Sequence, residues 1–216
     1  MQSIDATGLD HVVHDNPVVY LLLHDNTDTH IVTDVAKLAQ SLLGSPPVYV
    51  ATSTELFQRY HLVPSTSAAL LAFKDQDARE PVAVFYPSTE GTGLGTWMYT
   101  QRFPTSMELS KDVFQQVMYA PHTPLVVVVA TPEAQRASVS GKLDEIAKKW
   151  RLRTRVHGGA AINGAGVGAG REVVFTWMDA GQWAKWMKDM YGVKVRDEPV
   201  VVVADHAVRL PLGGGG

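Results

Sequence analysis

Short runs of apolar residues alternate along the chain with segments in which apolar residues recur every three or four positions. An unbroken run is typical of a strand buried on both faces, whereas the three- to four-residue spacing is typical of a helix with one buried face. In the first half, apolar runs predict strands at 17–24, 48–51, 68–73 and 82–86. Spacing predicts a helix capped by Thr33 that buries Val35, Leu38, Ala39, Leu42 and Leu43, a short helix at 54–60 and a closing helix at 97–103.

The second half repeats this order of elements. Helices are predicted at 109–119, 134–150 and 180–191, the last ended by Gly192, and strands at 125–130, 173–177 and 200–204. The repetition predicts two α/β domains, residues 1–103 and 104–216, each with a central mixed sheet flanked by helices. The second pattern ends near Leu212, before a last helix, so we expect this domain to be truncated. The closing Gly213–Gly216 resembles a linker, so we expect a fragment of a larger protein.

Composition limits the classes of function. A length of 216 residues suits two domains of about 100 each, and 45% hydrophobic residues can build two cores. The net charge of −3 argues against a basic nucleic-acid surface. The chain contains no cysteine, which excludes disulfide exchange, a zinc–thiolate site and a cysteine nucleophile.

Two further patterns resemble a dinucleotide-binding site and a metal-binding site, but neither meets the requirements of such a site. Gly164–Gly168 resembles a dinucleotide fingerprint, yet a strand follows it where a helix is required. His11, His14, His24 and His30 lie near several aspartates, but their spacing matches no metal-binding pattern. We therefore expect no cofactor, no metal and no catalytic residue, and a function based on binding.

Several segments carry a resemblance to a known family. Residues 48–62 (VYVATSTELFQRYHL) and 69–75 are similar to the b domain of protein disulfide isomerases, and residues 102–109 to the junction between its b and b′ domains. Tyr191-Gly192-Val193, followed by Pro199-Val200-Val201, resembles the b′ domain. The block at 172–203 is closest to fungal, membrane-anchored members. The resemblance implies two tandem thioredoxin-like domains from the lumen of the endoplasmic reticulum, without redox activity. It also implies a structural cis peptide bond before Pro199, whereas the first domain has Ala68 at the matching position.

In b′ domains a peptide-binding cleft lies between the first helix and the helix before the proline-led strand. On the first of these helices here, Leu109, Val113 and Val117 form the core stripe, and Phe114 and Met118 fall beyond its edge. The second of these helices, at 180–191, carries an arc of apolar residues that is wider than packing against one sheet requires. The residues expected at this binding site are Phe114, Val117, Met118, Trp183, Trp186, Met187, Met190 and Tyr191.

The resemblance and these residues predict a chaperone module that binds unfolded or misfolded polypeptides in a hydrophobic cleft. Two alternatives remain at this point. The same fold could dock one folded partner, such as a lectin chaperone or a glycan-processing enzyme, or it could serve as a structural spacer. Binding selectivity distinguishes the three functions. A chaperone cleft binds many unrelated peptides, an adaptor binds one folded partner, and a spacer binds neither peptides nor a partner.

Overall fold

The computed structural model describes residues 1–25, 30–41, 46–62, 67–87, 93–121, 124–158 and 172–205. The chain divides into two compact units. Of the described residues, the first unit contains Met1–Pro104 and residues 154–158, and the second contains Thr105–Arg153 and residues 172–205. The predictions concerning Leu42, Leu43, Gly164–Gly168 and Leu212 lie outside the described residues. Among the helices that the structure describes, none is both long and apolar enough to cross a membrane.

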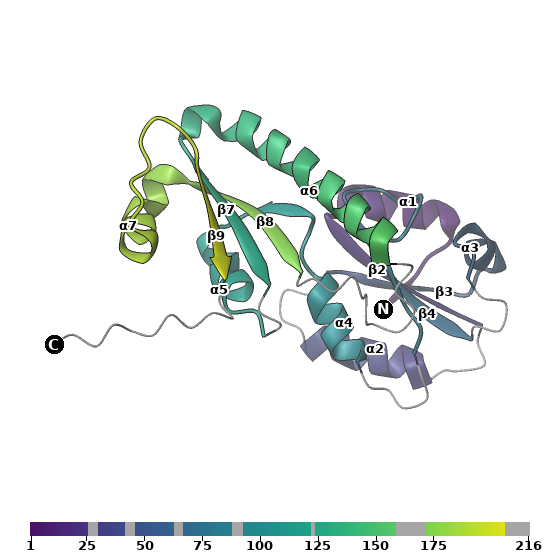
Figure 1. Cartoon of the computed structure of the whole chain (residues 1–216). Coiled ribbons are helices and arrows are strands. Elements are labelled where there is room, and N and C mark those ends of the chain that lie inside the picture. The colour runs from purple at the N-terminus through teal and green to yellow at the C-terminus, as the bar shows by residue number, and fades with distance from the viewer. Residues whose placement is uncertain are drawn as a thin grey trace. The chain divides into compact units, whose positions relative to one another are not determined.

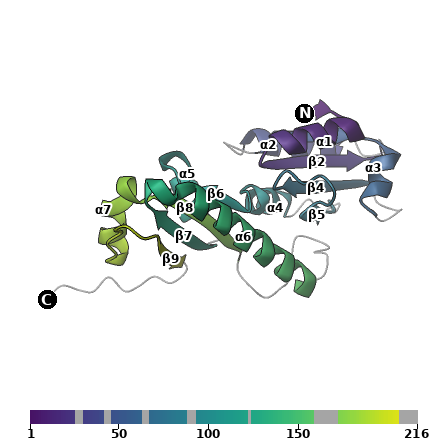
Figure 2. The same ribbon diagram turned by 90° about the horizontal axis from the view of Figure 1, so that it is seen from above.

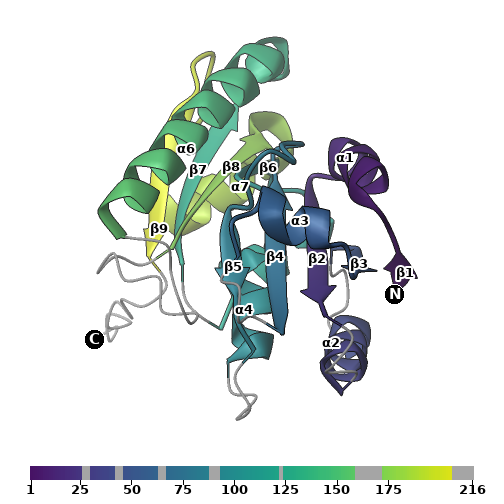
Figure 3. The same cartoon turned by 90° about the vertical axis from the view of Figure 1, so that its right-hand side faces the viewer.

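The first unit is built on a five-stranded mixed sheet with the order β1-β3-β2-β4-β5, which Figure 3 shows from β5 to β1. β2 runs parallel to β3 and antiparallel to β4, and β5 is antiparallel to β4. Every residue of β2 and β4 is buried, as unbroken apolar runs predict. The strands are β1 (Gln2–Ser3), β2 (Val18–His24), β3 (Val48–Ala51), β4 (Ala68–Lys74) and β5 (Ala83–Phe85).

Helices cover both faces of this sheet (Figure 1). α1 (Ala6–Asp15) and α3 (Thr54–Arg59) pack on the face that carries Leu21 and Leu71. α2 (His30–Ser41) and α4 (Leu94–Gln101) pack on the opposite face, with Leu22 and Leu70. The hydroxyl of Tyr20, on β2, donates a hydrogen bond to the carbonyl oxygen of Met98 on α4. Two hydrophobic cores therefore flank one sheet.

Four elements of the first unit, β1, α1, α2 and α4, differ from the sequence prediction by more than one residue. β1 and α1 were not predicted, and α2 begins at His30, so Thr33 lies inside the helix instead of capping it. α4 begins three residues before the predicted Trp97. α1 escaped prediction because only Leu9 and Val13 of its ten residues are buried. Its start is instead fixed by Asp5, whose carboxylate accepts a 2.7 Å hydrogen bond from the Gly8 amide.

Because of Tyr60, we expect the first unit to lose stability at alkaline pH. Its hydroxyl donates a 2.8 Å hydrogen bond to the Ala78 carbonyl, and burial raises the pKa of Tyr60 to about 12 from the ordinary 10.0. The folded protein therefore holds this proton more tightly than the unfolded chain, and stability falls as pH rises from about 10 to about 12. Tyr60→Phe should remove this contribution, which amounts to up to about 3 kcal/mol at its maximum. Urea unfolding of both proteins between these pH values measures the difference, and curves with the same pH dependence would contradict it.

The second unit has a four-stranded mixed sheet with the order β6-β8-β7-β9. β7 and β8 are parallel over seven residue pairs, and β9 is antiparallel to β7. The short strand β6, which was not predicted, runs parallel to β8 at the opposite edge from β9. The strands are β6 (Ser106–Glu108), β7 (Leu125–Thr131), β8 (Val173–Asp179) and β9 (Val200–Asp205).

Three α-helices pack on this sheet. α6 (Arg136–Gly158), which follows a 3-10 turn at Glu133–Gln135, lies along β7 and β8 and packs Leu143 and Ala147 against Val129 and Phe175 (Figure 2). α5 (Lys111–Met118) and α7 (Ala180–Tyr191) lie on the other face (Figure 1). The predicted bounds of α7 match the structure, and those of α5 were too wide because Leu109 and Ser110 precede its first turn.

The predicted cis peptide bond before Pro199 is wrong, because the described residues contain no cis peptide bond. Pro199 immediately precedes β9, and the first residue beyond a strand need not donate a ladder hydrogen bond. The trans form, which X–Pro bonds prefer, is therefore compatible with entry into the strand.

Candidate functional site

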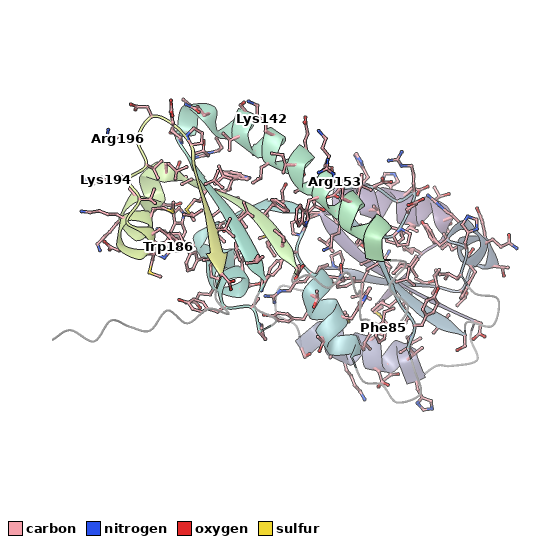
Figure 4. All side chains as sticks on the ribbon, in the orientation of Figure 1. Phe85, Lys142, Arg153, Trp186, Lys194 and Arg196 are labelled. Carbon is pink, nitrogen blue, oxygen red and sulfur yellow. The ribbon has the colours of Figure 1, made fainter. Side chains whose placement is uncertain are left out.

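Four aromatic side chains from α5 and the α7 region pack against one another on the second unit. The ring of Phe114 stacks on Trp183 with centroids 5.0 Å apart and an interplanar angle of 18°. Trp186 meets Phe114 edge-on at 5.2 Å, Trp183 at 5.9 Å and Tyr191 at 5.2 Å. Trp186 is thus the centre of the group, which we call the ring cluster (Phe114, Trp183, Trp186 and Tyr191); Figure 4 labels Trp186.

All four rings of the cluster are half-buried, so each presents part of its surface to solvent. Burial raises the pKa of Tyr191, and the nearby Tyr119 adds to this shift. Met190, one residue before Tyr191, is 58% exposed, and Tyr119, which follows α5 directly, is also exposed. Rings that contact one another and remain partly exposed form an apolar surface suited to binding rather than a closed core.

Three residues predicted at the site are interior instead. Val117, Met118 and Met187 are buried, and Met187 has no exposed area at all. The expectation that Met118 lies beyond the core stripe of α5 is therefore not met. α5 is only eight residues long and has both the sheet and α7 as neighbours, so a wider arc of it is covered. These three side chains can support the ring cluster but present no surface to a ligand in this conformation.

The ends of α7 hold this helix in place. At its start, the carboxylate of Asp179 accepts hydrogen bonds from the Gln182 amide at 2.8 Å and from Arg136 at 2.7 Å. These two hydrogen bonds, the Gln182 amide first, lower the pKa of Asp179. At its end, Gly192 adopts φ 67°, a left-handed conformation that favours glycine, and its amide donates to the Lys188 carbonyl at 2.9 Å.

Asp179→Ala should destabilise the second unit by about 1–2 kcal/mol, because it removes a helix cap and a partner of Arg136. Asp179→Asn is the matched comparison, since asparagine still caps a helix but carries no charge, and it should cost less. The lowered pKa of Asp179 means that its stabilisation is complete above the ordinary value of 3.8 and is lost as pH falls. Thermal unfolding of the three proteins at pH 7 and at acidic pH tests both statements. Equal stability of the Ala and Asn variants would contradict the capping role.

Both helices of the ring cluster also carry charged residues. The Lys185–Asp189 ion pair is exposed on α7, and it raises the pKa of Lys185. The described residues hold no group of three or more His, Asp or Glu side chains that could bind a metal ion. The partly exposed rings of the cluster can contact apolar side chains of a ligand.

Comparisons with known proteins agree with this architecture. The sequence matches the thioredoxin-like domain family over residues 24–212, so the chain belongs to that family. The structure is similar to the crystal structure of the bb fragment of ERp72, with a TM-score of 0.58 and 16% sequence identity. The similar region covers 95% of this chain and 85% of the ERp72 fragment. Human ERp44 form II is similar over 94% of this chain and 49% of its own, with a TM-score of 0.48 and 12% identity. No curated protein sequence matches.

These findings confirm the predicted fold class, a thioredoxin-like α/β fold with mixed sheets flanked by helices. At 16% identity the likeness to the ERp72 fragment concerns the fold alone. The comparisons give no support to the narrower resemblance to fungal, membrane-anchored proteins.

Proposed function

We propose that the second unit binds unfolded polypeptide through the ring cluster, as a non-catalytic module of a protein disulfide isomerase-like protein. The observation that carries this proposal is the mutual packing of four half-exposed rings from α5 and the α7 region, with the exposed Met190 beside them. Aromatic and methionine side chains suit ligands of varied sequence, because they offer large or adaptable apolar surfaces. The first unit, with both faces of its sheet covered, supplies rigidity and spacing.

The absence of cysteine fits this role, since a thiolate is the nucleophile of disulfide exchange. The resemblance of residues 48–62 and 69–75 to protein disulfide isomerases supports placing the protein in the endoplasmic reticulum lumen. The fold shared with the ERp72 bb fragment supports treating residues 1–103 and 104–216 as two thioredoxin-like domains. Binding is expected to be weak, because a shallow apolar surface makes few polar contacts and must order its ligand.

A fluorescence titration with a reduced, unfolded polypeptide tests the proposal. Excitation of the tryptophans should give a saturable change in emission, because Trp183 and Trp186 lie at the binding surface. Trp183→Phe keeps an aromatic ring in place and should reduce the amplitude of that change. Lys185→Ala, on the exposed side of the same helix, is the matched control and should leave the titration unaltered.

The titration also separates the remaining functions. A flat signal from the folded protein, with several unrelated polypeptides, would overturn the chaperone function and favour an adaptor or a spacer. A response to one folded partner and to no unfolded chain would identify the adaptor.

A further inference from the structure

Methionine is the only sulfur-containing residue type of this chain, because the sequence has seven methionines and no cysteine. All seven lie within the described residues, and they differ widely in burial. Met107 is half-buried, Met1 at the N-terminus is 43% exposed, and Met190 on α7 is 58% exposed. The other four are buried, namely Met98, Met118, Met178 and Met187. Met190 is therefore the most exposed methionine of the protein.

Met190 lies on the same side of α7 as two rings of the ring cluster. It follows Trp186 by four residues and Trp183 by seven, and residues at these spacings lie one above the other on a helix. Trp186 is the centre of the ring cluster (Figure 4). Met187, three residues before Met190, has no exposed area. One turn of α7 thus carries a methionine that solvent cannot reach and another that lies at the apolar surface.

Exposure decides which methionine a hydroperoxide can oxidise, because the peroxide must reach the sulfur. A lone pair of the thioether sulfur attacks one peroxide oxygen, so that a sulfur–oxygen bond forms and the oxygen–oxygen bond breaks. The sulfur loses two electrons, and the proton of the transferred hydroxyl moves to the leaving oxygen. The products are the sulfoxide and an alcohol, or water when the oxidant is hydrogen peroxide. Since the chain has no cysteine thiolate to react instead, exposed thioethers are its sulfur targets.

We propose that Met190 is an oxidation site through which hydroperoxides regulate the ring cluster. Oxidation converts a flexible apolar side chain into a polar one with a strong hydrogen-bond acceptor. Contact with an apolar side chain of a ligand then removes this oxygen from water without providing a donor, which disfavours binding. The oxidised protein therefore binds unfolded polypeptide more weakly. This consequence rests on the proposed function of the ring cluster, whereas the preferential oxidation of Met190 does not.

Oxidation at this position leaves the fold of the second unit intact. The side chain of Met190 is largely exposed, so the added oxygen needs no room in the core. The ends of α7 are held by the Asp179 cap and by Gly192, and neither involves Met190. The change is also reversible, because methionine sulfoxide reductases return the sulfoxide to the thioether, with a dithiol as the electron donor and water as a product. A reversible change at the surface of a stable helix is suited to regulation.

Mass spectrometry of the whole chain after brief exposure to hydrogen peroxide tests the oxidation site. Trypsin cleaves after lysine and arginine, so digestion of the quenched and unfolded protein places Met187 in residues 186–188 and Met190 in residues 189–194. The Met190 peptide should gain one oxygen at least about tenfold faster than the Met187 peptide. Met187 is the matched control, since the two should react at similar rates when the protein is unfolded in urea before treatment. Equal rates in the folded protein would overturn the assignment of this site.

An anisotropy titration of a labelled, reduced polypeptide, performed after the peroxide is removed, tests the regulation. Peroxide treatment of the wild type should weaken binding about 3- to 10-fold, and methionine sulfoxide reductases with dithiothreitol should restore it. Met190→Leu keeps an apolar side chain of similar size but cannot form a sulfoxide at this position. Its affinity should therefore be the same before and after treatment. Circular dichroism checks that the treated proteins remain folded.

The two experiments separate this inference from the proposed function. Unchanged affinity of wild type that is oxidised at Met190, or an equal loss of affinity in treated Met190→Leu, would overturn the regulation. If the untreated wild type binds no polypeptide, the proposed function is overturned and the regulation with it. The rates measured by mass spectrometry decide the oxidation site in either case, because they require no ligand.

Discussion

Replacing Met187 with alanine should lower the free energy of unfolding of the second unit by about 2–5 kcal/mol. Met187 lies on α7 with 0% of its side chain exposed, so the substitution leaves a cavity in the interior. The loss of buried surface and the cavity both act against the folded state. Chemical denaturation followed by tryptophan emission measures the effect, because four of the five tryptophans belong to the second unit.

Met190→Ala is the matched control for this substitution. Met190 is on the same helix, three residues further along, but 58% of it is exposed, so its replacement should change stability by no more than about 0.5 kcal/mol. Equal effects of the two substitutions would contradict the placement of Met187 in the core and Met190 at the surface.

Replacing Trp183 with alanine should weaken the binding of unfolded polypeptide about 5- to 30-fold, which corresponds to about 1–2 kcal/mol. The side chain stacks on Phe114 and contacts Trp186, so its removal takes away one ring face and loosens two others. Large aromatic side chains that are partly buried in the free protein lose little conformational freedom on binding, and they often dominate binding energy.

The measurement is the anisotropy of a labelled, reduced polypeptide titrated with wild type, Trp183→Ala and Lys185→Ala. The lysine variant controls for a substitution on the same helix and should bind like wild type. If Trp183→Ala binds with unchanged affinity while remaining folded, the ring cluster is not the binding surface.

Much of this fold follows from local patterns in the sequence. β2, β4, β7 and β9 are apolar runs bounded by polar or turn residues, and the bounds predicted for them agree with the structure to within one residue. α7 was predicted from its apolar spacing and from Gly192, and its C-terminus has the left-handed conformation that glycine favours. These elements carry their information within a few neighbouring residues.

Other features depend on contacts between distant residues and gave no local signal. β1 and β6 have two and three residues, too few for a periodic pattern, and they exist through pairing with β3 and β8. Helical spacing placed Met187 and Trp183 on one apolar arc but could not say which faces the core. The structure separates them, with Met187 fully buried and Trp183 half-exposed against Phe114. Tyr119 was missed as a neighbour of the site because it lies just beyond the end of α5.

The most direct test of peptide binding by the ring cluster is a ¹H–¹⁵N spectrum of the tryptophan indoles during titration with an unfolded polypeptide. The chain has five tryptophans, so the spectrum contains one indole signal for each of five side chains. We predict saturable shifts for Trp183 and Trp186 and a constant signal for Trp97, which is buried in the first unit. Constant signals for Trp183 and Trp186 in the presence of excess polypeptide would contradict the proposed function.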